Sequence, residues 1–253
     1  MDDKIRVAVV GAKGRMGTET VAAINAENDL ILVSAVDQGE SLADMLAISS
    51  AQVMVDFSVP SAVMGNIEMA LARGIVPIVG TTGLHDSDID HVRSLCRSAN
   101  TGALIAPNFA IGAVLLMRFC AEAAKYLPDV EIIEMHHERK IDSPSGTAVK
   151  TAEMIAQSRS DESRFVAPDG AYEKYAGARG ASGVGDVPIH SVRLPGFVAS
   201  QMVIFGGLGQ TLTMRHDSLD RKSFMPGVIH AVRQFHKLKS NRGELIYGLE
   251  NLL

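Results

Sequence analysis

The segment EMHHERKIDSPSGTAVK, residues 134–150, gathers side chains that can transfer protons and bind anions. Two adjacent histidines, His136 and His137, are followed by Lys140. A histidine can donate a proton near neutral pH, and a lysine can hold a carboxylate or act as an acid itself. The segment therefore predicts proton transfer combined with anion binding.

The second half of this segment supplies further anion ligands. Ser145 or Thr147 can cap a helix, which the helical spacing of the apolar residues behind them predicts. The first N–H groups of a helix have no acceptor within it, so they attract anions together with the Ser and Thr hydroxyls. Combined with the histidines and Lys140, this turn predicts a pocket for a small dicarboxylate.

Metal binding and nucleophilic catalysis are not supported by the same residues. If VEIIEMHH is a strand, His136 and His137 point to opposite faces and cannot easily bind one metal ion. There is no H-E-x-x-H pattern, and neither Cys96 nor Cys120 has a neighbouring base in sequence. We expect no metal and no acyl transfer.

A glycine turn near the N-terminus carries the second chemical motif. The sequence VAVVGAKGRMGTET places Gly11, Gly14 and Gly17 between an apolar strand and a helix. Glycines there let backbone N–H groups approach a pyrophosphate at the positive end of the helix. The spacing G-x-x-G-x-x-G differs from the common dinucleotide pattern, and a plain tight turn is the alternative.

Asp37 strengthens the dinucleotide interpretation, since it ends the second predicted strand, where an acidic group hydrogen-bonds the ribose hydroxyls. Asp37 would repel a 2′-phosphate and favours NADH, whereas Lys13 and Arg15 supply positive charge that could accept NADPH. The sequence leaves both cofactors open. The alternatives are that Lys13 and Arg15 are solvated loop charges and that Asp37 only forms a turn.

Two further loops follow strands that should end at the same edge of a sheet. They are VGTTG at 79–83 and APNF at 106–109, and both could line the nicotinamide half of a cofactor. Polar loops at strand ends are also common without function.

Taken one at a time, His136, His137 and Lys140 could be ordinary strand or surface residues. Their close spacing beside a dinucleotide-type domain favours a functional interpretation.

The elements that must position these residues form two domains. Strands and helices alternate up to Asn108, which predicts an α/β fold with a Rossmann-like, doubly wound parallel sheet in residues 1–108. Residues 109–217 show a long apolar helix and then strand signals, which predict a second, α+β domain with a mixed sheet. A C-terminal helix in 218–253 is expected to pack back on the first domain, and the polar residues 158–185 to form a long loop.

Composition narrows the possible partners. The 253 residues are 47% hydrophobic and carry a formal charge of −5, so no general field attracts nucleic acid or an anionic membrane. The two cysteines suit a reducing compartment, and no leader or membrane span is visible. We expect a cytoplasmic protein without nucleic-acid or membrane partners.

The segment EMHHERKIDSPSGTA resembles the signature E-x-H-H-x-x-K-x-D-x-P-S-G-T-A of the 4-hydroxy-tetrahydrodipicolinate reductase family, also called dihydrodipicolinate reductases. The resemblance extends to VAVVGAKGRMG, VDFSVP, VGTTG, APNFAIG, IHSVRLPG and GQTLTMRHDSLDRKSFMPGV, in family order and across nearly the whole chain. It implies NADH- or NADPH-dependent reduction of a cyclic dicarboxylate, with loss of water, in lysine and diaminopimelate synthesis.

The resemblance also implies roles for individual residues. His136 and Lys140 match catalytic positions, His137 a substrate histidine, and Gly146 with Thr147 a substrate-binding pair, to which the Ser145 hydroxyl adds. The implied cofactor contacts are Gly11, Ala12, Lys13, Gly14, Arg15, Met16, Asp37, Gly80, Thr81, Thr82, Ala106, Pro107, Asn108 and Phe109.

At one position, the sequence differs from that of some family members. Some members have an arginine after the acidic residue to hold the NADPH phosphate, and here that position is Gln38. Family members usually form tetramers through the C-terminal sheet, which implies a homotetramer. Two alternatives are a semialdehyde dehydrogenase, which should show a cysteine nucleophile in a polar loop, and a non-catalytic nicotinamide-nucleotide sensor, which needs no acid cluster.

Overall fold

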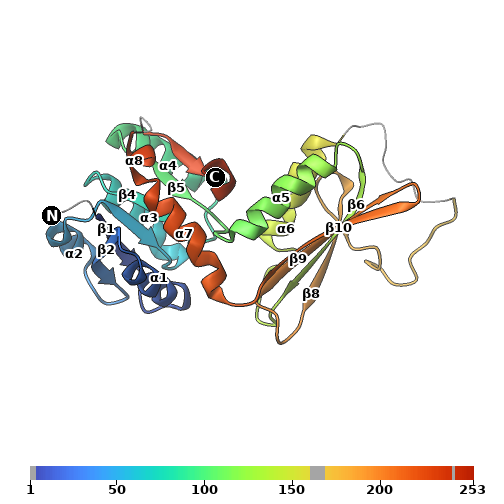
Figure 1. Cartoon of the computed structure of the whole chain (residues 1–253), viewed down its shortest axis with the longest axis horizontal. Helices are drawn as coiled ribbons and strands as arrows, with labels where there is room; N and C mark the ends of the chain where they lie inside the picture. Colours follow the sequence, from blue (N-terminus) through green and yellow to red (C-terminus); the bar gives the residue numbers. More distant parts are fainter. Residues whose placement is uncertain (1–3, 160–168, 241–242) are drawn as a thin grey trace. The chain divides into compact units, whose positions relative to one another are not determined.

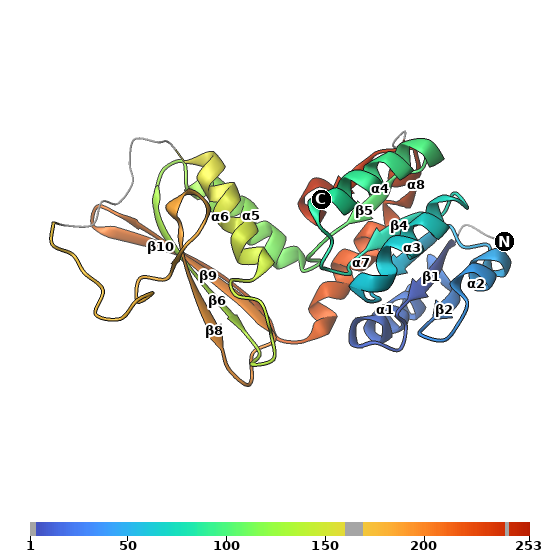
Figure 2. The ribbon, with the colours of Figure 1, turned by 180° about the vertical axis from the view of Figure 1, so that it is seen from behind.

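The computed structural model describes residues 4–159, 169–240 and 243–253, and the chain divides into two compact units (Figure 1, Figure 2). One unit comprises Met1–Ile111 with Arg221–Leu253, and the other comprises Gly112–Asp220. The sequence predicts divisions after residues 108 and 217, whereas the compact units divide after Ile111 and Asp220.

The first unit is built on a six-stranded sheet with the order β11-β5-β4-β3-β1-β2, in which every pair of neighbours is parallel. β1, β3, β4 and β5 are short apolar runs whose residues are almost all buried, as expected for strands covered on both faces. The strands are β1 (Ile5–Val10), β2 (Leu30–Val36), β3 (Val53–Asp56), β4 (Val76–Val79), β5 (Ala103–Ile105) and β11 (Leu245–Tyr247).

Helices cover both faces of this sheet. α2, α3 and α4 share buried clusters with the strands on one face, while α1 and α7 contact each other and β1 on the other (Figure 1, Figure 2). This is the doubly wound arrangement that the alternating pattern predicts. The helices are α1 (Arg15–Ala26), α2 (Leu42–Ser49), α3 (Pro60–Leu71), α4 (Asp86–Ala99), α7 (Met225–Arg233) and α8 (Phe235–Ser240), with the 3-10 turns η2 (Arg221–Phe224) and η3 (Leu249–Asn251).

The second unit is a five-stranded mixed sheet with the order β10-β9-β6-β8-β7. β6 lies parallel to β8 and antiparallel to β9, and α5 and α6 cover one face over a core that includes Ile132, Ile155 and Phe205 (Figure 1). The predicted α/β class with a second, mixed sheet is therefore confirmed. The elements are α5 (Ile111–Ala123), β6 (Asp129–His136), α6 (Gly146–Ser158), β7 (Ala181–Ser182), η1 (Val184–Asp186), β8 (Pro188–Arg193), β9 (Ala199–Gly207) and β10 (Gln210–Ser218).

The prediction of a C-terminal helix across residues 218–253 is wrong in part. α7 and α8 are helical, but β11 then joins the parallel sheet beside β5. Its three residues lie between Gly243 and Gly248, both with positive φ, so the chain turns before and after it. Of the predicted loop at 158–185, residues 160–168 lie outside the described residues. No helix in the described ranges has the length and hydrophobicity needed to cross a membrane.

Candidate active site

The second unit centres on a buried carboxylate in β6. Glu134 is completely buried, and His136 lies two residues further on, on the same face of the strand. Nδ1 of His136 lies 2.5 Å from Oε2 of Glu134. The side chain of His136 is 15% exposed, so a predicted catalytic residue sits at the margin of the core with one ring nitrogen already engaged.

Arg193 holds the same carboxylate from the neighbouring strand β8. The register sets Arg193 opposite His136, and its Nη1 and Nη2 donate to Oε2 and Oε1 of Glu134 at 2.9 and 2.7 Å. Such forked guanidinium–carboxylate pairs are strong and geometrically specific. Nη2 also donates to the backbone oxygen of Asp142 at 2.8 Å, which ties the loop after β6 to the strands.

The hydrogen bonds around Glu134 keep it ionised. Burial alone would raise the pKa of Glu134, but hydrogen bonds from His136, Arg193 and Ser191 outweigh it and lower the pKa to about 2. The backbone N–H of Ser145 donates to Oε1 at 3.3 Å as well. One permanent anion therefore joins β6, β8 and the start of α6.

Lys140 has an anionic neighbour of its own. Its Nζ lies 2.7 and 2.8 Å from the two carboxylate oxygens of Asp142, and the lysine side chain is 21% exposed, whereas that of Asp142 is 63% exposed. Burial raises the pKa of Asp142, but the hydrogen bond from Lys140 and other contacts lower it overall. The predicted lysine is thus held in place by Asp142, a partner that the sequence analysis did not single out.

The helix that the sequence predicts behind Ser145 is present, and its N-terminus lies at the start of α6. Ser145 caps the helix, since its Oγ accepts from the N–H of Ala148 at 3.3 Å. Gly146 and Thr147 occupy the first two helical positions, and a Cβ built on Gly146 would meet no atom within 4 Å. The structure brings this terminus to Glu134 and hence to His136. His137 lies directly after β6 and is half-buried.

In the first unit, the glycine turn between β1 and α1 is tight at each glycine. Gly11 has a φ of +75°, and a Cβ on it would lie 2.5 Å from the backbone oxygen of Phe57. A Cβ on Gly14, the N-cap of α1, would lie 3.1 Å from the oxygen of Gly11, and one on Gly17 only 2.0 Å from it. The turn has the bare backbone that a pyrophosphate needs, with Lys13 and Arg15 exposed, Met16 half-buried and Ala12 buried.

Asp37 lies where the sequence predicts a ribose-binding acid, directly after β2. Its carboxylate accepts from the N–H groups of Lys13 at 2.5 Å and Gln38 at 2.7 Å, and these backbone hydrogen bonds lower its pKa. Glu40 accepts from the N–H of Asp37 at 2.7 Å and from Nζ of Lys13 at 3.2 Å. Glu40 is a second acid at this corner, which sequence reasoning missed.

A buried aspartate organises the next loop. Asp56 ends β3 fully buried, and it accepts from the hydroxyls of Thr81 and Ser58 at 2.7 Å each and from Nδ2 of Asn66 at 2.8 Å. The loop after β4 is thereby fixed to the end of β3. A Cβ on Gly80 would collide with the ring of Phe57, while Thr82 is exposed. Asp56 lies in the VDFSVP motif, but its role as an anchor was not predicted.

The loop after β5 packs against Phe57, which follows β3, and against α7. The rings of Phe57 and Phe109 meet edge to face with centroids 5.8 Å apart, and Oδ1 of Asn108 accepts from the N–H of Ala110 at 2.8 Å. Ala106 is buried and Pro107 exposed. A Cβ on Gly227 in α7 would lie 2.0 Å from the oxygen of Phe109, so the C-terminal segment supports this predicted cofactor loop directly.

The part of the chain that the structure describes offers no comparable site for metal binding or for a cysteine nucleophile. Among the described residues, no cluster of three or more His, Cys, Asp or Glu side chains could hold a metal ion. Cys96 and Cys120 are free and buried, and burial raises their pKa to about 11 and about 12. Buried thiols of this kind are poor nucleophiles, which argues against the semialdehyde dehydrogenase alternative.

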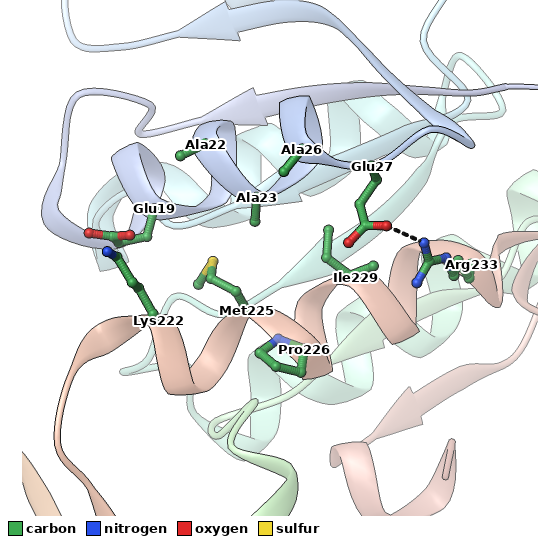
Figure 3. Close-up of a pocket in the computed structure, with 10 residues that line it drawn as sticks. All are labelled: Glu19, Ala22, Ala23, Ala26, Glu27, Lys222, Met225, Pro226, Ile229 and Arg233. Atoms are coloured by element: carbon green, nitrogen blue, oxygen red, sulfur yellow. Dashed lines mark hydrogen bonds and ion pairs between the residues drawn. The ribbon is translucent and has the colours of Figure 1, made fainter.

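A groove of about 490 Å³ lies between α1 and α7 (Figure 3). The groove is lined by alanines of α1 and by Met225, Pro226 and Ile229 of α7, and an ion pair joins Glu27 and Arg233 at one end. None of the predicted site residues lines it.

These features define a class of protein. The first unit combines a parallel sheet with a glycine turn, an acid after β2 and ordered loops after β4 and β5, which are the features of a nicotinamide-dinucleotide unit. The second unit adds a histidine and a lysine suited to proton transfer. The class is that of the two-domain, nicotinamide-dependent oxidoreductases.

The comparisons with known proteins narrow this class to one family. Residues 5–109 match the family model "Dihydrodipicolinate reductase, N-terminus", and residues 112–253 match "Dihydrodipicolinate reductase, C-terminus". The chain belongs to the dihydrodipicolinate reductase family, and it is an NAD(P)H-dependent oxidoreductase. The resemblance drawn from the sequence is confirmed.

Individual relatives agree over their full length. The 4-hydroxy-tetrahydrodipicolinate reductases of Desulfitobacterium hafniense and Streptomyces coelicolor are each 48% identical, covering 99% of this chain and 99% and 98% of theirs. A dipicolinate-bound dihydrodipicolinate reductase from Paenisporosarcina sp. TG-14 is 41% identical with a TM-score of 0.85, covering 99% of this chain and 100% of that one. A probable dehydrogenase from Thermotoga maritima, 11% identical with a TM-score of 0.66, shares the fold alone.

Proposed function

We propose that this protein reduces 4-hydroxy-tetrahydrodipicolinate to tetrahydrodipicolinate, with loss of water, using NADH or NADPH. The reaction belongs to the diaminopimelate route to lysine. The observation that carries the proposal is the cluster of His136, Glu134 and Arg193 beside the N-terminus of α6, in a chain that also has a dinucleotide unit. The names of the full-length relatives support it.

The cofactor belongs at the turn of Gly11–Met16, where the glycines leave room for a pyrophosphate against backbone N–H groups. Asp37 would hold the ribose hydroxyls, and the loops Gly80–Thr82 and Ala106–Phe109 would line the nicotinamide half. When bound, the reduced nicotinamide supplies the hydride. The buried Asp56 and the contact between Phe57 and Phe109 keep the two loops in place.

The substrate carboxylates belong at the N-terminus of α6 and at Lys140. Backbone N–H groups of Gly146 and Thr147, with the hydroxyls of Ser145 and Thr147, form one anion site, and His137 adds a donor. The dicarboxylate character of the ligand is supported by the dipicolinate of the Paenisporosarcina relative. The Lys140 ammonium would exchange Asp142 for a substrate carboxylate on binding.

Proton transfer belongs to His136 and Lys140. Nδ1 of His136 faces Glu134, so Nε2 is the nitrogen that would face the substrate. Lys140 is our first choice for the acid that completes the reduction and for stabilising substrate charge, with His136 supplying or relaying a proton.

The test is absorbance loss of NADH and NADPH, side by side, with freshly synthesised 4-hydroxy-tetrahydrodipicolinate. We expect rapid oxidation by the wild type and a loss of about 10²- to 10⁴-fold in turnover for Lys140→Ala, with cofactor affinity unchanged. Lys150→Ala, which removes a lysine of α6 paired with Glu153, is the matched control and should retain full activity. A Lys140→Ala variant with wild-type turnover would refute the role of the lysine. Cofactor binding without any oxidation by the wild type would favour the nicotinamide-sensor alternative.

We also propose that the protein is a cytoplasmic homotetramer assembled through the sheet of the second unit. Support comes from β10, an edge strand whose residues are mostly exposed, including Leu212 at 38%, and from Leu208 in the hairpin before it, which is fully exposed. Light scattering of the purified protein checks the tetramer, and a monomeric mass would refute it.

A further inference from the structure

Glu134 combines features that a structural ion pair alone does not require. Its carboxylate is inaccessible to solvent, yet it contacts a histidine, an arginine and a helix N-terminus from three different elements. Replacing a buried ion pair with apolar residues often leaves stability unchanged or improved, so stability alone is a weak reason for this arrangement. The arrangement does fix the ring of His136 in one orientation.

The contact also determines which nitrogen of His136 carries a proton. Glu134 is ionised, because the Arg193 fork and the other donors stabilise its charge, so it can only accept hydrogen bonds. The 2.5 Å contact therefore requires a proton on Nδ1 of His136. With Nδ1 protonated, the ring can donate a proton from Nε2 only as the imidazolium, in which both ring nitrogens carry a proton.

We propose that Glu134 is a positioning residue for the reduction, which orients His136, fixes its Nδ1 proton and aligns the anion site of α6 with it. Arg193 holds Glu134 in turn and fixes the loop that carries Lys140 through the oxygen of Asp142. Glu134 itself contacts neither substrate nor cofactor in this scheme; it acts through His136 and Ser145. The inference rests on the proposed function and adds a residue to it.

The decisive experiment is a double-mutant cycle of Glu134→Gln and His136→Gln, assayed with 4-hydroxy-tetrahydrodipicolinate and NADH. Glu134 acts on proton transfer through His136 and on the substrate anion site through Ser145. We therefore expect Glu134→Gln to lower kcat by about 10- to 100-fold, and the kcat of the double variant to be within about threefold of that of His136→Gln alone. The KM for NADH should stay within about twofold of the wild type in all three variants, since the cofactor residues lie in the other unit. Losses that multiply, or an unchanged kcat in Glu134→Gln, would overturn the proposal.

Glu131→Gln is the matched control. Glu131 lies on β6, three residues before Glu134 and therefore on the opposite face, and it too contacts a histidine, His190 at 2.9 Å, and an arginine, Arg179. The control should retain wild-type kcat. A kcat loss in Glu131→Gln as large as in Glu134→Gln would show that any lost carboxylate on this strand has the same effect, and it would also overturn the proposal.

Removing only one partner of a buried ion pair can prevent folding. If Glu134→Gln does not fold, judged by circular dichroism, the cycle is run with the pair Glu134→Gln/Arg193→Gln in its place, which leaves no uncompensated charge. Because Arg193 also holds the loop of Lys140, the expected result is a loss in the triple variant that is smaller than the product of the losses in the pair and in His136→Gln. A wild type that oxidises neither NADH nor NADPH defeats the proposed function and this inference together, whereas an active wild type with additive losses defeats the inference alone.

Discussion

Gly17 provides a direct test of how tightly the dinucleotide turn is built. It lies inside α1, where a helix accepts alanine, yet a Cβ there would lie 2.0 Å from the oxygen of Gly11 and 2.7 Å from its carbonyl carbon. Ordinary contacts begin at about 3.4 Å, so Gly17→Ala must move the turn and the helix apart by about 1.4 Å. Both groups are backbone and cannot rotate away.

The cost of this change follows from overpacking. Inserting a methyl group into a filled space costs roughly 1–3 kcal/mol, which for a chain of this size lowers Tm by about 2–12 °C. The better helix propensity of alanine offsets up to about 1 kcal/mol of it. Because the displaced atoms form the predicted pyrophosphate site, we expect the Kd for NADH to rise roughly tenfold, equivalent to about 1.4 kcal/mol.

Differential scanning calorimetry and NADH fluorescence titration measure the two effects. Gly65→Ala is the matched control, because Gly65 lies inside α3, is exposed, and a Cβ there would meet no atom within 4 Å. The control should leave NADH binding unchanged and stabilise the chain by up to about 1 kcal/mol. If Gly17→Ala matched the control in Tm and Kd, the steric account of the turn would be wrong.

Two further predictions concern charged groups. Glu40→Gln should raise kcat/KM with NADPH relative to NADH, because it removes an anion and releases Lys13 for a 2′-phosphate; an unchanged ratio in paired assays would contradict this. The pKa of Glu134 is about 2 in the folded chain, below its ordinary value of 4.5, so its contribution to stability is complete above about pH 4.5 and is lost as the pH falls toward 2. Urea unfolding between pH 5 and 2 should show a flatter profile in Glu134→Gln/Arg193→Gln, and parallel profiles would contradict this reasoning.

Much of the first unit could be predicted because buried parallel strands are recognisable in the sequence as continuous apolar runs. Val7–Val10, Val53–Val55 and Val76–Val79 are buried on both faces, so their composition alone marks them. β11 escaped prediction because its three residues, LIY, are too few to show a period. Its place depends on pairing with β5, which is remote in sequence.

The site could be predicted only in part, because several of its contacts join residues that are far apart in the sequence. Strand alternation already places Glu134 and His136 on one face of β6, so that pair had a local signal. The partner Arg193 is 59 residues further on, and only the register of β6 with β8 sets it opposite His136. Asp56 was missed similarly, because its partner Thr81 comes from a different loop.

The two ion pairs near the predicted substrate site differ in what they can do. In the pair of Glu134 and Arg193, the carboxylate is completely buried. A ligand could replace Glu134 as the partner of Arg193 only if the surrounding residues unfolded. The pair of Lys140 and Asp142 has its carboxylate largely in solvent, where the attraction is weak and exchange is easy. In the proposed scheme, a chain with a net charge of −5 can therefore still bind a dicarboxylate. The buried pair would fix the geometry, and the exposed pair would keep an ammonium in place until a substrate carboxylate replaced Asp142.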